Sequence, residues 1–167
     1  MLKNLFSRKP ATGQTLYGAI VAAARQPKPY QDWGVPDTVD GRFEMLVLHL
    51  YLVLERLPTD AETLRQSLTD LFFADMDRSL REMGVGDLSV GKKVRKMAEA
   101  FYGRATAYTE ASASGVDHLA SALTRNVFDN DKNQGMPEAL ATWTMAAKAK
   151  LRQQTVSEIA SGDVVFQ

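Results

Sequence analysis

Hydrophobic positions recur at helical spacing along most of the chain, and convincing strand alternation is almost absent. The strongest pattern lies in residues 41–57. Its wide apolar stripe consists of Phe43, Leu46, Val47, Leu50, Leu54 and Leu57. Leu48 and Val53 extend the apolar character almost around the helix, which is typical of a helix at the centre of a bundle. Pro58 then ends the segment.

The same period predicts helices on either side of this central one. They cover about residues 15–26, 59–83, 89–112, 116–128 and 137–154, with a last turn around Ile159 and extended residues 163–167. Thr59 and Glu62 are spaced as a capping box, while Ser89 and Ser114 are placed as N-caps. Gly84 stands where a left-handed helix end is expected. Residues 28–40, with three of the chain's prolines or glycines, are expected to be irregular.

These elements predict an all-α, single-domain helical bundle of about six helices with the hydrophobic helix 41–57 at its centre. Residues 13–167 form the predicted domain, and residues 1–12 form a flexible basic N-terminal segment. That segment has Leu2, Leu5 and Phe6 near cations, so a weak contact with a membrane interface is the alternative. Because no apolar run approaches the roughly 20 residues of a spanning helix, no transmembrane segment is expected.

Composition excludes several classes of function. The chain has 167 residues and no cysteine, which removes disulfides, thiolate metal sites and a cysteine nucleophile. Twenty Lys and Arg side chains balance twenty Asp and Glu, so overall charge does not favour a specific DNA partner. With only two histidines, a metal site would need carboxylate ligands.

No catalytic constellation emerges from the titratable residues. His49 lies on the apolar central helix and is interpreted as a core histidine, while His118 follows a helix start and is interpreted as a surface residue. Asp77 and Arg81 are spaced i, i+4 and predict a surface ion pair. We therefore expect no catalytic residues, no metal and no cofactor.

The start of the helix at residue 89 is unusually basic. Residues 89–104 contain five basic side chains against the single acid Glu99; the five are Lys92, Lys93, Arg95, Lys96 and Arg104. A helix N-terminus already carries partial positive charge, so helix stability alone favours acids there. These five residues are predicted to bind an anionic partner such as a phosphate, a lipid headgroup, RNA or an acidic peptide. The alternative is local neutralisation by Asp87 and by the negative end of the preceding helix.

The stretch between residues 30 and 42 is a second candidate surface. Tyr30 and Trp33 have apolar bodies and polar tips, a combination favoured at interfaces. Asp37 and Arg42 complete this predicted interface loop, although acids here also suit helix capping.

Two blocks of sequence resemble the ubiquinol–cytochrome c chaperone family. The first block is GVPDTVDGRFEMLVLH at residues 34–49, and the second is DMDRSLREMGVGDLSV at residues 75–90, continuing through Lys92 and Lys93 to Arg104. The resemblance marks Asp75, Asp77, Arg78 and Arg81 as a motif at a helix end. It also marks Asp37, Arg42, Lys92 and Arg104 as motif positions, without giving them roles.

The resemblance implies an all-helical, non-enzymatic assembly factor for the cytochrome bc1 complex. Its implied client is newly made cytochrome b, which mitochondrial members hold near the ribosome together with a second small chaperone. Because little precedes the family-like body, the chain is interpreted as bacterial and cytoplasmic, with a peripheral contact to the inner membrane. The alternative function is a helical adaptor that binds RNA, the ribosome or anionic lipid through the basic helix end.

Overall fold

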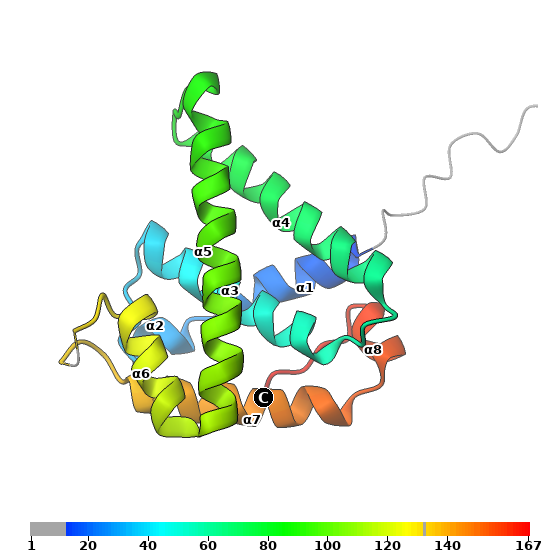
Figure 1. Cartoon of the computed structure of the whole chain (residues 1–167), viewed down its shortest axis with the longest axis vertical. Helices are drawn as coiled ribbons and strands as arrows, with labels where there is room; N and C mark the ends of the chain where they lie inside the picture. The colour runs from blue at the N-terminus through cyan, green and yellow to red at the C-terminus, as the bar shows by residue number, and fades with distance from the viewer. Residues whose placement is uncertain (1–12, 132) are drawn as a thin grey trace, which may run out of the picture.

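The computed structural model describes residues 13–131 and 133–167, and this part of the chain is all-helical, without strands. Its eight helices are α1 (Gln14–Ala24), α2 (Lys28–Asp32), α3 (Val39–Arg56), α4 (Glu62–Glu82), α5 (Asp87–Ser114), α6 (Val116–Val127), α7 (Pro137–Gln153) and α8 (Val156–Ala160) (Figure 1). The predicted all-α fold is confirmed. The predicted basic segment 1–12 lies outside the described residues.

Helix α3 lies at the centre, as its all-round apolar pattern predicts. Every residue from 44 to 53 is buried, and the helix packs against α1, α5, α6 and α7. Thr38 starts the helix earlier than expected, because its hydroxyl accepts a 3.1 Å hydrogen bond from the backbone N–H of Gly41. A Cβ at Gly41 would lie 1.8 Å from the carbonyl oxygen of Pro36, so the preceding loop closes directly over this glycine.

Several predicted helix ends differ from the observed ones. The capping box expected at Thr59 is wrong, since α4 begins after Ala61 without a side-chain cap. The N-caps expected at Ser89 and Ser114 are also wrong, because Gly86 and Gly115 occupy those positions. A capping box forms instead at Thr155, which starts α8. Gly84 does adopt the predicted left-handed conformation, with φ of 87°.

Two short helices raise the number above the predicted six. Residues 28–32, expected to be irregular, form α2, because Pro27 and Pro29 suit the first turn of a helix. The turn predicted around Ile159 is α8, where Ile159 is buried.

Helices α4 and α5 form a long antiparallel hairpin. Near the body it is held by a cluster of aromatic rings, in which the centroids of Phe72 and Phe101 are 5.3 Å apart. The turn between the two helices projects away from the rest of the molecule (Figure 1). The hairpin tip is defined here as residues 81–96.

Candidate partner-binding surface

The hairpin tip gathers four cations that no carboxylate of the described chain neutralises. Lys92, Lys93, Arg95 and Lys96 are all exposed, and none forms an ion pair within residues 13–131 and 133–167. Asp87, the acid expected to compensate them, instead contacts Arg81. Local neutralisation by Asp87 is therefore wrong, and the positive charge of the tip faces solvent.

Arg81 organises the acids at this end of α4. Its guanidinium donates to Asp77 at 2.8 Å, the predicted i, i+4 pair, and also contacts Asp87 at the start of α5. These contacts join the last turn of α4 to the first turn of α5. The lysines one turn further along α5 take no part in these ion pairs.

Asp75 has a different role in the same motif. Its carboxylate accepts a 2.8 Å hydrogen bond from the Tyr17 hydroxyl and a 2.5 Å bond from Arg78. Burial, with this bond as a second cause, raises the pKa of Tyr17. Asp75 thus connects α4 to α1, and its position in the family-like block is explained by packing.

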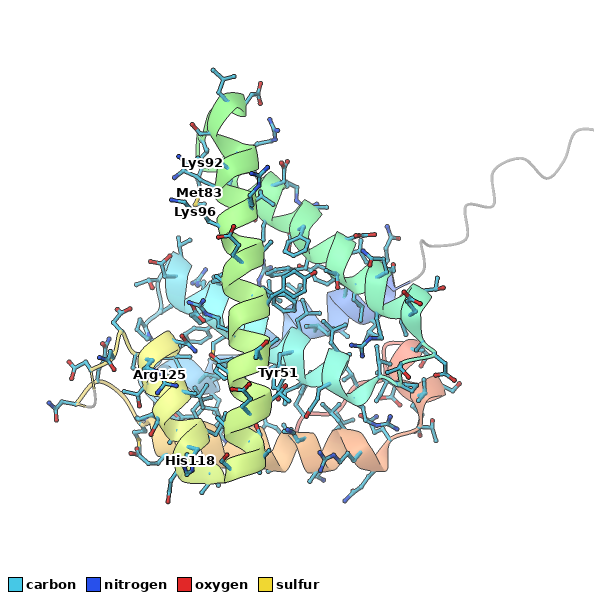
Figure 2. The ribbon with its side chains drawn as sticks, viewed as in Figure 1. Tyr51, Met83, Lys92, Lys96, His118 and Arg125 are labelled. Atoms are coloured by element: carbon cyan, nitrogen blue, oxygen red, sulfur yellow. The ribbon has the colours of Figure 1, made fainter. Side chains whose placement is uncertain are left out.

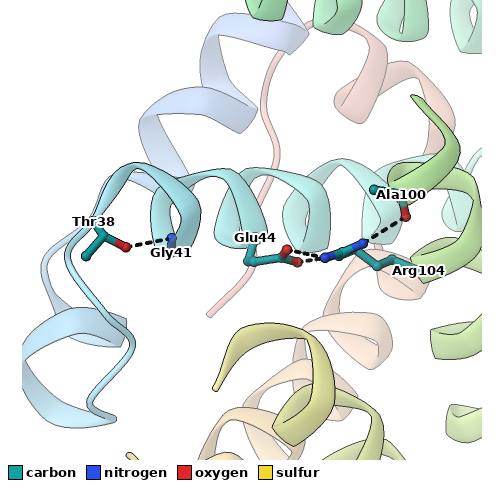
Figure 3. A network of polar contacts seen from close by, with 5 residues as sticks. All are labelled: Thr38, Gly41, Glu44, Ala100 and Arg104. Atoms are coloured by element: carbon teal, nitrogen blue, oxygen red, sulfur yellow. Dashed lines mark hydrogen bonds and ion pairs between the residues drawn. The ribbon is translucent and has the colours of Figure 1, made fainter. Parts of the chain in front are cut away.

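Arg104 does not join the other four basic residues. Its Nε and Nη2 donate to the two carboxylate oxygens of Glu44 at 2.6 and 2.5 Å, and its Nη1 donates to the carbonyl of Ala100 at 3.3 Å (Figure 3). The Glu44 side chain is only 8% exposed and that of Arg104 22%. Burial raises the pKa of Glu44, and the Arg104 hydrogen bonds partly oppose this rise. Arg104 therefore fastens α5 to α3, inside the body.

The four residues of the predicted interface loop fall into two groups, one packed on the body and one exposed. Tyr30 is half-buried and donates to the carbonyl of Ala24 at 3.0 Å, while Trp33 packs on Trp143 of α7, with ring centroids 5.7 Å apart. Both aromatic side chains thus hold the loop onto the body. Asp37 and Arg42 form an exposed ion pair of 2.7 Å.

An apolar groove runs beside the hairpin, with a volume of about 530 Å³. Its apolar lining comes from four helices and consists of Val21, Ala24, Phe43, Leu46, Met76, Leu80 and Met97, together with Val39 and Met83. Val39 and Met83 are 60% and 52% exposed. Arg42 of the predicted interface loop and Asp75 of the helix-end motif also line the groove.

Leu88 is the residue that sequence reasoning missed. It is completely exposed, at 102%, in the first turn of α5. Its signal in the sequence was an apolar residue within a glycine-rich turn, where no buried stripe requires one. Lys92, Lys96 and the exposed Met83 lie at this same end of the molecule, opposite to His118 and Arg125 (Figure 2).

The remaining candidate chemistry is structural. His49 is buried against Trp143 and Phe166, and its Nδ1–H donates to the carbonyl of Met45 at 2.7 Å. Burial lowers the pKa of His49 to about 4, so it is the predicted core histidine, neutral at pH 7. Residues 13–131 and 133–167 contain no group of three His, Asp or Glu placed to share a metal ion. None of the described helices has the length and apolar content needed to cross a bilayer.

Comparison with known proteins matches most of the helical body. A family model described as ubiquinol-cytochrome C chaperone covers residues 31–166. A ubiquinol-cytochrome-c reductase complex assembly factor 1 from Xenopus laevis is 24% identical over 103 residues, which are 60% of this chain and 52% of that protein. The chain therefore spans about half the length of this curated relative. A crystal structure of the Cbp3 homolog from Brucella abortus is 39% identical, with a TM-score of 0.83, over 94% of this chain and 89% of the other.

Proposed function

The chain belongs to the ubiquinol-cytochrome C chaperone family, and from this premise we propose that it is a non-enzymatic chaperone for assembly of the cytochrome bc1 complex. The observation that carries this proposal is the 39% identity and common fold with the Cbp3 homolog over nearly the full length of both chains. The Xenopus relative, whose name describes assembly of the same complex, supports it.

We propose that the client is newly made cytochrome b, and that it is held in the groove beside the hairpin. A membrane protein presents long apolar segments before it is assembled, and a groove that receives them must tolerate varied shapes. Methionine side chains are flexible and polarisable, which suits such a surface. Met76, Met83 and Met97 all line the groove, and Met83 and Val39 extend its apolar surface into solvent.

We propose that the cations of the hairpin tip complete this client surface on its polar side. Charge at the edge of an interface mainly raises the association rate and selects the partner. The cytoplasm, with a peripheral contact to the inner membrane, is the proposed location.

Charge reversal at the tip tests this part of the proposal. The triple variant Lys92→Glu, Lys93→Glu and Lys96→Glu should recover about tenfold less cytochrome b after crosslinking in a detergent extract, because like charges then meet the client. The matched control is Arg125→Glu, Lys150→Glu and Arg152→Glu, which makes the same change of charge at exposed positions on α6 and α7. Equal recovery by the two variants, with normal circular dichroism, would remove the tip from the client surface.

RNA, including ribosomal RNA, is the alternative ligand for the same cations. The affinity for RNA would then fall steeply with salt, because each phosphate contact releases counterions. Purified chain titrated with single-stranded RNA at several salt concentrations distinguishes this alternative. A salt slope that the tip variant removes and the control variant keeps would favour RNA over a protein client.

A further inference from the structure

The hairpin tip combines an apolar apex with a band of cations behind it. Leu88, in the first turn of α5, is fully exposed, and Met83, in the last turn before the α4–α5 connection, is half-exposed. Single exposed apolar residues are common on protein surfaces. Here the fully exposed Leu88 stands at the start of α5 at the projecting α4–α5 turn, and Met83 lies at the level of Lys92 and Lys96 (Figures 1 and 2).

The side chains of this surface share one side of α5. Leu88, Lys92, Arg95 and Lys96 follow the spacing i, i+4, i+7 and i+8, which places them on one helix face. Val90 and Phe101 point to the opposite face and are buried. The exposed face is therefore the one that the bundle leaves open.

The distances along the helix suit a bilayer interface. With a rise of about 1.5 Å per residue, the cations lie roughly 6–12 Å behind Leu88 along the axis. Apolar side chains of interfacial proteins enter the boundary between headgroups and acyl chains to a depth of about 5–10 Å. If the tip enters first, Leu88 reaches this boundary while the cations remain at the level of the lipid phosphates.

The net charge of the tip selects an anionic surface. Residues 81–96 carry five basic and two acidic side chains, and one of these acids, Asp87, is bound to Arg81. Leu88 at the apex is fully exposed and is not among the residues that line the groove, which Met83 borders beside the tip. A fluid surface of anionic headgroups closes around such an apex without requiring a complementary shape.

We propose that the hairpin tip docks on an anionic lipid bilayer, with Leu88 inserted among the headgroups and Lys92, Arg95 and Lys96 on the lipid phosphates. This docking specifies how the membrane contact of the proposed function is made. It rests on that function only for the identity of the membrane. The tip anchors the chaperone reversibly, and the client groove beside the tip then faces the membrane into which a client is inserted.

Vesicle binding by the full purified chain, without cytochrome b, tests the docking. The chain should float with vesicles of phosphatidylcholine and phosphatidylglycerol, and stay unbound with phosphatidylcholine alone. Replacing Lys92, Arg95 and Lys96 by Gln should weaken binding about 100-fold, since each cation near an anionic surface contributes roughly a factor of five. The matched control replaces the exposed cations Arg125, Lys150 and Arg152 by Gln and should bind like the parent chain.

Insertion of the apex is measured at Leu88 itself. Because the chain has no cysteine, Leu88→Cys carries a single environment-sensitive dye, with Ser157→Cys on α8 as the exposed control. The dye at position 88 should shift to the blue with anionic vesicles, and the dye at position 157 should not.

Three results would overturn the proposal: flotation with an unshifted dye at position 88, equal binding by the two triple variants, or binding to RNA without binding to vesicles. Attachment through residues 1–12 would give the second of these results. Cytochrome b recovery in detergent extract is measured without a bilayer, so it can fail or succeed independently of the vesicle assay.

Discussion

Removal of the Arg104 guanidinium tests whether this motif residue holds the fold together. Arg104→Met keeps most of the side-chain length and its packing but leaves the Glu44 carboxylate, 8% exposed, without its two charged hydrogen bonds. Loss of one partner from a buried ion pair typically costs about 3–5 kcal/mol, because the other charge stays buried. That is a large part of the roughly 5–15 kcal/mol that stabilises a typical domain.

A double variant shows whether the loss of stability comes from the unpaired charge on Glu44. Glu44→Met combined with Arg104→Met removes both charges, and buried ion pairs replaced by apolar side chains of similar volume are often neutral in stability. We therefore expect the double variant to recover most of the free energy of unfolding that Arg104→Met loses. Urea denaturation followed by circular dichroism on the parent chain, both single variants and the double variant completes the cycle.

The pH dependence of the free energy of unfolding provides a second test of this prediction. Burial already raises the pKa of Glu44 in the folded chain, and loss of Arg104 raises it further. The folded variant then binds a proton more tightly than the unfolded chain, so its deficit is largest above the folded pKa and shrinks as the pH falls through it. An Arg104→Met variant as stable as the parent chain, or a double variant as unstable as the single one, would refute the reasoning. Arg104 would then return to the partner-binding residues.

Two further predictions concern glycines in α3 and α5 and the buried His49. Gly41→Ala should destabilise the fold by about 3 kcal/mol or more, because the added Cβ meets the Pro36 carbonyl at 1.8 Å. Gly91→Ala, which has open space around it in α5, should stabilise the fold by roughly 0.5–1 kcal/mol. Equal thermal unfolding midpoints of the two variants and the parent chain would contradict both predictions. The unfolded chain binds a proton at His49 near pH 6.5 but the folded chain only near 4, so stability should fall by about 2 kcal/mol between pH 7 and pH 5. His49→Leu should remove this fall, and parallel pH profiles of unfolding free energy would show that another group causes it.

The helical class, the central helix and most helix spans follow from the order of amino acids alone. These depend on the spacing of apolar residues and on prolines and glycines that stop a helix, and both act over a few neighbouring residues. The family resemblance was also carried by the order of residues, in two blocks that the family model later matched. Helix caps were less predictable, since a side chain such as Thr59 caps only if the backbone beside it turns correctly.

Which charges are available to a partner depends on how the helices pack in space. Arg104 and Lys92 belong to the same basic run, yet Arg104 meets Glu44 across 60 residues of sequence, while Lys92 meets no acid of the described chain. The same holds for apolar residues, because Leu88 is exposed only by the projection of the α4–α5 turn beyond the bundle. Pairing and exposure depend on which helices become neighbours in space, and local spacing carries no information on contacts of that range.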